Sequence, residues 1–79
     1  MLINLAKDVG TVIREARKSK GWNQTQLAQK IGVNQRKISV MENNPSKIDL
    51  EIILYACSAL ELKLEINSLS SYTTMETDW

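Results

Sequence analysis

Residues 21–44 read GWNQTQLAQKIGVNQRKISVMENN, and this stretch contains nearly the same three residues twice. WNQ occupies positions 22–24, and VNQ follows at positions 33–35. Asparagine is a favoured N-cap, because its side-chain oxygen accepts a hydrogen bond from a free backbone N–H of the first helical turn. The repeat therefore predicts two helices, one beginning after Asn23 and the other after Asn34.

The neighbouring residues agree with two closely spaced helices. Gln26 stands three positions after Asn23, where its side chain can complete a capping box. Gly32 can adopt the left-handed conformation that ends a helix. We expect a two-turn helix over residues 24–31, a tight glycine turn, and a second helix beginning at Gln35. This is the helix-turn-helix arrangement.

Two further helices are expected around this pair. A helix over residues 5–20 is predicted by apolar residues at positions i, i+3, i+4 and i+7, namely Val9, Val12, Ile13 and Ala16. Pro45 breaks the chain after the second short helix, and Asp49 can cap a fourth one. The residues of that fourth helix expected to complete the core are Leu50, Ile53, Leu54, Cys57 and Leu60.

Residues 60–67, LELKLEIN, alternate apolar and polar side chains without interruption, which is typical of a β-strand. The sequence contains no second strand pattern, and an unpaired strand leaves backbone groups and an apolar face exposed. We therefore expect this strand to pair antiparallel with its copy across a two-fold axis, giving a homodimer. The interface residues would be Leu60, Leu62, Leu64 and Ile66. The alternative is one longer helix over residues 52–64.

The predicted domain spans residues 1–69, and residues 70–79, SSYTTMETDW, form a flexible acidic tail. The tail ends on Trp79, a large aromatic side chain of the kind that anchors in a partner's pocket. The alternative is a solubility tail with an incidental tryptophan.

Positive and negative charges are separated along the chain. Residues 1–43 contain eight Lys and Arg against three Asp and Glu, whereas residues 44–79 contain two against six. A basic half and an acidic half suggest a polyanion on one side and a different partner on the other. Accidental clustering on a nearly neutral surface is the alternative.

Enzyme, metal and membrane functions find little support. The chain has no histidine, so it lacks a Ser-His-Asp or Cys-His arrangement, and its glycines are single. We expect no catalytic residue, no metal site and no cofactor. The single Cys57 permits no intrachain disulfide. No run approaches the roughly 18 apolar residues of a membrane span, and no signal peptide is recognisable at the start, so a cytoplasmic location is expected.

DNA binding is favoured by the two helix starts, whose free N–H groups and helix dipoles attract phosphates. Gln24 suits a phosphate contact, and Gln35 is placed to reach an adenine edge in the major groove. Arg36 is the best candidate for guanine, and Lys37 or Asn43 for the DNA backbone. The full set of expected contacts with double-stranded operator DNA is Gln24, Thr25, Asn34, Gln35, Arg36, Lys37, Ser39, Val40 and Asn43.

Residues 5–60 resemble the Xre/phage-repressor helix-turn-helix family. The similar positions are Gln24, Leu27, Ala28, Gly32, Val33, Gln35, Ile38, Ser39 and Glu42. The resemblance implies a mostly α, lambda-repressor-like four-helix domain, to which the predicted C-terminal strand is added. It also implies that Arg17 and Glu42 form a structural brace rather than a DNA contact.

The stretches GWNQTQLAQKIGVNQRKIS, MENNP and ALELKLEI, and a tail ending in tryptophan, are similar to those of HipB-type antitoxins. The resemblance implies a dimeric repressor of its own operon in a type II toxin-antitoxin system. It further implies a partner, a HipA-like serine/threonine kinase toxin made of one chain or split into two. Arg36, Lys37 and Val40 depart from the HipB pattern, so a different operator is expected.

Two alternatives remain open. A phage-type or restriction-modification controller regulator would share the helices but carry a fifth helix in place of the strand. A pure interaction protein with this fold would not bind operator DNA.

Overall fold

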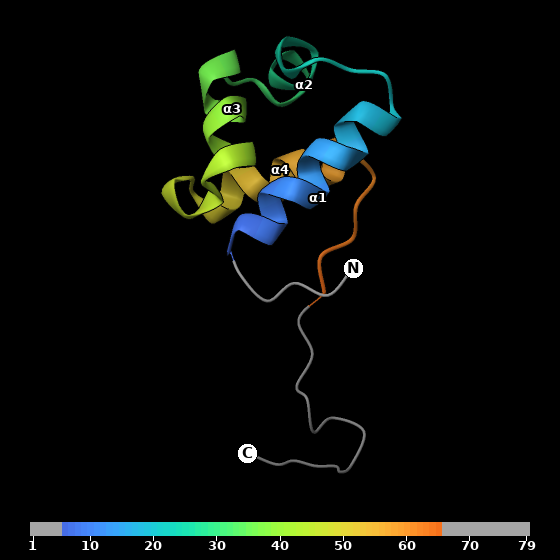
Figure 1. Cartoon of the computed structure of the whole chain (residues 1–79). Helices are drawn as coiled ribbons and strands as arrows, with labels where there is room; N and C mark the ends of the chain where they lie inside the picture. The colour runs from blue at the N-terminus through green and yellow to red at the C-terminus, as the bar shows by residue number, and fades with distance from the viewer. Residues whose placement is uncertain (1–5, 66–79) are drawn as a thin grey trace, which may run out of the picture.

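The computed structural model describes residues 6–65, which form four α-helices and one 3₁₀ turn (Figure 1). The α-helices are α1 (Ala6–Ser19), α2 (Gln24–Ile31), α3 (Gln35–Asn43) and α4 (Leu50–Ala59). The 3₁₀ turn η1 (Pro45–Lys47) begins at the proline that was expected to break the chain. The mostly α, four-helix prediction is confirmed. No helix among these residues is long and apolar enough to cross a membrane.

Both short helices begin as the repeated motif predicts. The Asn23 side chain accepts a hydrogen bond from the Gln26 backbone N–H at 2.7 Å, and the Asn23 N–H donates to Gln26 Oε1 at 2.8 Å. The Asn34 Oδ1 accepts from the Lys37 backbone N–H at 2.8 Å. At the end of α2, Gly32 has a φ of 76°, where a residue with a Cβ atom would be strained.

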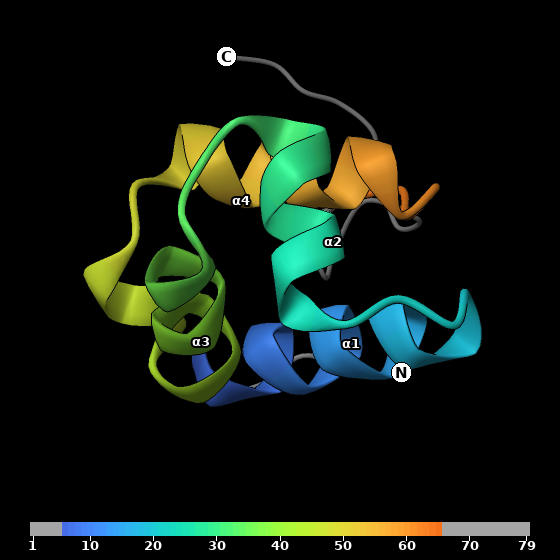
Figure 2. The ribbon, with the colours of Figure 1, turned by 90° about the horizontal axis from the view of Figure 1, so that it is seen from above.

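The hydrophobic core lies where the four helices meet. Seen from above, α2 runs from α1 towards α4, and α3 stands beside α2 (Figure 2). Each α-helix or its end contributes buried side chains to one cluster, made of Ile13, Leu27, Ala28, Ile38, Met41, Ala56 and Leu60. The core thus fixes α2 and α3 relative to each other.

α1 and the end of α3 approach each other unusually closely at Gly10. A Cβ atom added there would lie 2.3 Å from the Glu42 carbonyl oxygen and 2.9 Å from that of Met41. Only a hydrogen at this position permits such contact. Gly10 therefore sets the distance between α1 and the C-terminal turn of α3.

The fourth helix differs from the expectation in its buried face. Leu50 and Leu54, expected in the core, are 62% and 42% exposed, and Ala56 is buried instead. Because α4 is apolar on nearly every side, its sequence does not identify one core face. Asp49 precedes the helix, but its side chain makes no capping hydrogen bond.

The alternative of one longer helix over residues 52–64 is wrong. α4 ends at Ala59, and Glu61 takes a φ of 60°. The Leu62 N–H then donates to the Cys57 carbonyl at 2.8 Å and the Glu61 N–H to the Ser58 carbonyl at 3.2 Å, the two bonds of a Schellman motif. Residues 62–65 follow without regular secondary structure in this single chain. The rest of the expected strand and the tail lie outside the described residues.

Candidate DNA-binding surface

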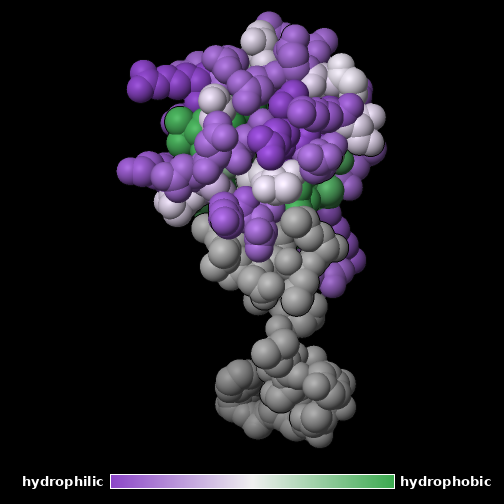
Figure 3. All heavy atoms as spheres, in the orientation of Figure 1, coloured by the Kyte–Doolittle hydropathy of each residue, from purple (hydrophilic) through white to green (hydrophobic). Residues whose placement is uncertain are grey.

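Helix α3 packs against the core with one side and leaves its other side exposed. Ile38, Met41 and Glu42 are buried, whereas Gln35, Arg36, Lys37 and Asn43 are exposed. Ser39 and Val40 are half-buried between these two faces. In Figure 3, hydrophilic side chains cover most of the described surface around α1 and α3. The outer face of α3 is thus polar, accessible and rigidly supported.

Some of the residues expected to contact DNA also make hydrogen bonds within the protein. The Asn34 Oδ1 is occupied by the capping bond to Lys37, which leaves its amide nitrogen for an external contact. The Asn43 Nδ2 donates to the Ser39 carbonyl at 2.8 Å, within α3 itself. Thr25 is exposed on the first turn of α2. The positively charged ends of Arg36 and Lys37 are carried on exposed side chains.

Beneath this surface, Arg17 and Glu42 form a buried ion pair. The Arg17 Nε donates to Glu42 Oε2 at 2.7 Å, and its second terminal nitrogen donates to Oε1 at 3.1 Å. Arg17 also donates to the Trp22 carbonyl at 2.8 Å. The two charged residues are only 7% and 4% exposed. The pair ties α1 to the end of α3 and to the loop before α2.

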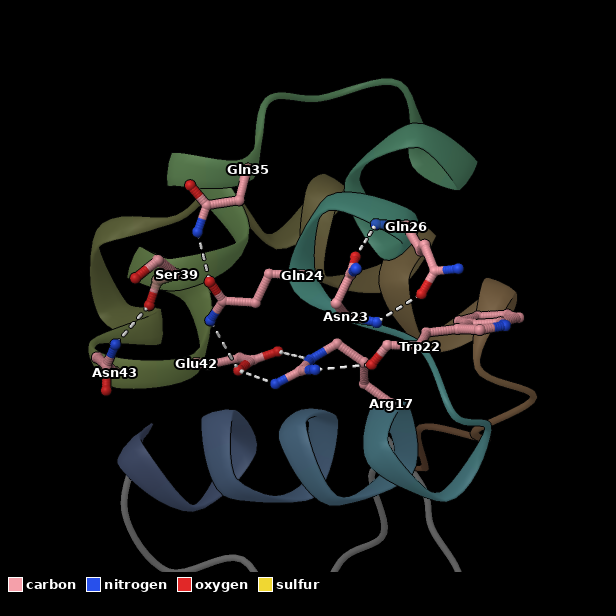
Figure 4. Close-up of polar contacts among 9 residues, drawn as sticks. All are labelled: Arg17, Trp22, Asn23, Gln24, Gln26, Gln35, Ser39, Glu42 and Asn43. Atoms are coloured by element: carbon pink, nitrogen blue, oxygen red, sulfur yellow. Dashed lines mark hydrogen bonds and ion pairs between the residues drawn. The ribbon is translucent and has the colours of Figure 1, made fainter.

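Two glutamines extend this pair to the surface (Figure 4). The Gln24 Nε2 donates to Glu42 Oε1 at 3.2 Å, and the Gln35 Nε2 donates to Gln24 Oε1. Gln24 and Gln35, which were predicted as separate DNA contacts, are therefore hydrogen-bonded to each other, and Gln24 is also bonded to the buried Glu42 carboxylate. The equivalent positions of the two glutamines, each directly after its capping asparagine, were the only signal of this contact in the sequence.

The residues expected at the dimer interface differ in how deeply they are buried in the single chain. Leu60 belongs to the core and is only 3% exposed, and the partly buried Leu62 packs against the core cluster. Leu64 is 48% exposed. Ile66 and Trp79 lie outside the described residues.

Possible metal ligands and the single cysteine were also located among the described residues. No group of three or more His, Cys, Asp or Glu side chains is placed there to hold a metal ion. Cys57 is buried, and this burial raises the pKa of its thiol, so the thiol stays protonated and unreactive near neutral pH.

The Lys20 ammonium, 2.8 Å from the Glu61 carboxylate, lowers the pKa of Glu61.

Comparison with known proteins agrees with this geometry. A family model described as helix-turn-helix (HTH_3) matches residues 13–67. The antitoxin HipB of Escherichia coli K12 is 34% identical over 58 residues, which cover 73% of this chain and 66% of the relative. HipB of E. coli O6:H1 strain CFT073 has the same identity, with 62% of its length covered. The chain thus spans slightly less than two thirds of these curated relatives.

Two solved structures are similar over most of the chain. The HipB chain of a HipB-O1-O2 complex has a TM-score of 0.78 and 31% identity, with 86% of this chain and 99% of that chain covered. The match to a HipA-HipB-O2-O3 complex has a TM-score of 0.79 and 30% identity, with 87% and 97% covered. With its two capped helices and the exposed outer face of α3, the chain belongs to the Xre-type helix-turn-helix family of DNA-binding proteins and is similar to the HipB antitoxins.

Proposed function

We propose that this protein is a homodimeric, sequence-specific transcriptional repressor that also acts as the antitoxin of a HipA-like serine/threonine kinase. The observation that carries the proposal is the outer face of α3, where exposed polar and basic side chains stand on a helix held by the core. This face has the geometry of a helix that enters the major groove and reads base edges. Similarity to HipB, solved in a complex with HipA, supports the toxin partner.

The Arg36→Ala variant tests the reading of bases. Arg36 is exposed and outside the core, so the variant should fold normally. We expect a loss of about 1–3 kcal/mol on the cognate duplex, together with relaxed preference at one base pair. The measurement is the affinity for duplexes substituted at each position in turn. Equal losses on every duplex would show that Arg36 contacts only phosphate.

The Leu64→Lys variant tests the proposed strand-paired dimer. Leu64 is half-exposed in the single chain, so the lysine should leave the fold intact. Across the two-fold axis it would introduce charge into the paired apolar face, and we expect monomers by sedimentation. Glu65→Lys, one position along on the polar side of the alternation, is the matched control and should remain dimeric. A dimeric Leu64→Lys protein would contradict strand pairing.

Removal of residues 70–79, or Trp79→Ala, tests the tail as the toxin-binding element. We expect weaker kinase binding with unchanged operator affinity, because an aromatic anchor contributes mainly to its own interface. The measurements are titrations of each variant with the kinase and with the promoter duplex. Loss of DNA binding would mean that the tail belongs to the DNA-binding unit instead.

The proposal as a whole is tested by co-expression of the tagged chain with the gene beside its own, followed by purification at moderate salt. A stoichiometric complex with a kinase of one or two chains, which still binds the promoter DNA, is the expected result. A dimer that binds the promoter without any partner would instead indicate a phage-type or controller regulator.

A further inference from the structure

Two open hollows lie on the surface formed by α2 and α4, and the side chain of Lys30 lines both of them. The first has a volume of about 320 Å³ and is otherwise lined by Trp22, Gln26 and Gln29. The second has a volume of about 380 Å³, and its apolar lining comes from Ile31, Tyr55 and Ala59. Because they share one side chain, the two hollows form a single groove, which we call the α2–α4 groove.

The α2–α4 groove contains a lysine that no carboxylate neutralises. Within residues 6–65, Lys30 makes no ion pair, and its ammonium lies 4.6 Å from the centre of the Trp22 ring. Lys20, 5.6 Å from the centre of the same ring, is instead paired with Glu61. An aromatic ring attracts a cation without cancelling its charge, so Lys30 remains able to bind a carboxylate.

The other end of the groove is apolar. Tyr55 is 50% exposed there, and Ile31 and Ala59 are half-buried residues that pack against the core. The Tyr55 hydroxyl donates to the Glu51 carboxylate of the same helix at 2.9 Å, so this polar atom already has a partner. A segment that fits both ends of the groove must therefore carry an acidic residue close to a large apolar one.

The last residues of the chain have this composition. Residues 66–79 contain Glu76 and Asp78 and no lysine or arginine, and Trp79 directly follows Asp78. Their negative charge is complementary to Lys30, and their aromatic residue is of a kind that buries a large apolar area.

The chain passes close to the groove shortly before this segment begins. The Lys20 Nζ lies 2.8 Å from the Glu61 carboxylate and 5.6 Å from the centre of the Trp22 ring. Fully extended, residues 66–79 span about 45 Å, which is enough to reach a groove that begins so near. A segment tethered in this way has an effective concentration of millimolar order, so even a weak contact is well populated.

We propose that residues 70–79 dock in the α2–α4 groove of their own chain, with an acidic side chain on Lys30 and Trp79 at the apolar end. In Figure 4, Trp22 and Gln26 lie away from Gln35, so the docked segment leaves the outer face of α3 open to DNA. One consequence rests on the proposed function: a Trp79 held in the groove is withheld from the kinase, and the two contacts compete.

The test uses the full-length protein with a nitroxide label on Thr74→Cys, observed by NMR. The buried Cys57 thiol is protected, so the label reacts with the new cysteine. We expect the Trp22 indole and Lys30 amide signals to lose about half of their intensity or more, because a tethered contact of millimolar strength is occupied for much of the time. The amide signal of Asn43, at the end of α3, should keep its intensity.

Reversing the charge of Lys30 is the decisive variant. Lys30→Glu places a carboxylate opposite the acidic segment, and the intensity loss at Trp22 should disappear. Adding Glu76→Lys and Asp78→Lys to this variant should restore it. Lys47→Glu, exposed on η1, makes the same change of charge outside the groove and should behave like the wild type. An intensity loss that persists in Lys30→Glu, or is absent from the wild-type sequence, overturns the proposal.

Mixed samples show whether the segment reaches its own chain or a second copy. Isotope-labelled chains without nitroxide are refolded together with unlabelled chains that carry it. We expect full intensity at Trp22 in this mixture, and an intensity loss would show docking on the other copy and overturn docking within one chain. Neither measurement uses DNA or kinase, so failure of the docking and failure of the proposed function are distinguishable.

Discussion

Replacing Glu42 alone by methionine is expected to lower the free energy of unfolding by about 3–5 kcal/mol, because Arg17 is left buried with an unpaired charge. Gln24 also loses the acceptor for its Nε2. A domain of this size has a total stability of roughly 4–12 kcal/mol, so the loss is a large part of it. Urea denaturation followed by circular dichroism measures the change.

The double variant Arg17→Met with Glu42→Met is the control for this prediction. Replacing a buried ion pair by apolar side chains of similar volume is often neutral or stabilising, so the double variant should recover most of the loss. The interaction energy from the four proteins should therefore be large and of opposite sign to the single losses. Losses that simply add would contradict a coupled, buried pair.

Gly10→Ala is expected to lower the free energy of unfolding by about 1–3 kcal/mol, the range typical of overpacking. The new Cβ atom would lie 2.3 Å from the Glu42 carbonyl oxygen, which belongs to the backbone of α3 and cannot turn aside. Alanine on its own favours a helix over glycine by about 1 kcal/mol. A less stable variant would therefore show that the steric clash outweighs helix propensity, and a more stable one would show the opposite.

Thr11→Ala, at the next position of α1, is the control for this substitution. Thr11 is half-buried, and its hydroxyl donates to the Lys7 carbonyl of the same helix. We expect a change within about 0.5 kcal/mol of zero. Thermal unfolding of both variants gives the comparison, and an unchanged or more stable Gly10→Ala protein would refute the close approach of α1 and α3.

The features predicted well from the sequence are those that depend on neighbouring residues. The capping bonds of Asn23 and Asn34 and the left-handed Gly32 each follow from the chemistry of a few adjacent positions. The exposed residues of α3 include Gln35, Arg36, Lys37 and Asn43, all of them among the expected DNA contacts. Local chemistry was sufficient for the helix-turn-helix unit.

The features that could not be predicted from the sequence depend on contacts between helices. Leu54 was expected in the core because α4 is apolar on most sides, and only packing against α2 selects Ala56 instead. The hydrogen bonds from Glu42 through Gln24 to Gln35 join α3 with the start of α2, and no spacing rule predicts their direction. Two residues after the end of α4, Glu61 adopts the left-handed conformation that stops the helix, without the usual glycine.

The central claim is that the outer face of α3 reads particular bases, and the most direct test is the affinity of the wild-type protein for its own promoter duplex against a scrambled duplex of equal length. Fluorescence anisotropy at several salt concentrations gives both affinities. We expect the promoter to bind at least about 10³-fold more tightly, with both affinities falling steeply as salt rises. Equal affinities for the two duplexes at every salt concentration would contradict the account.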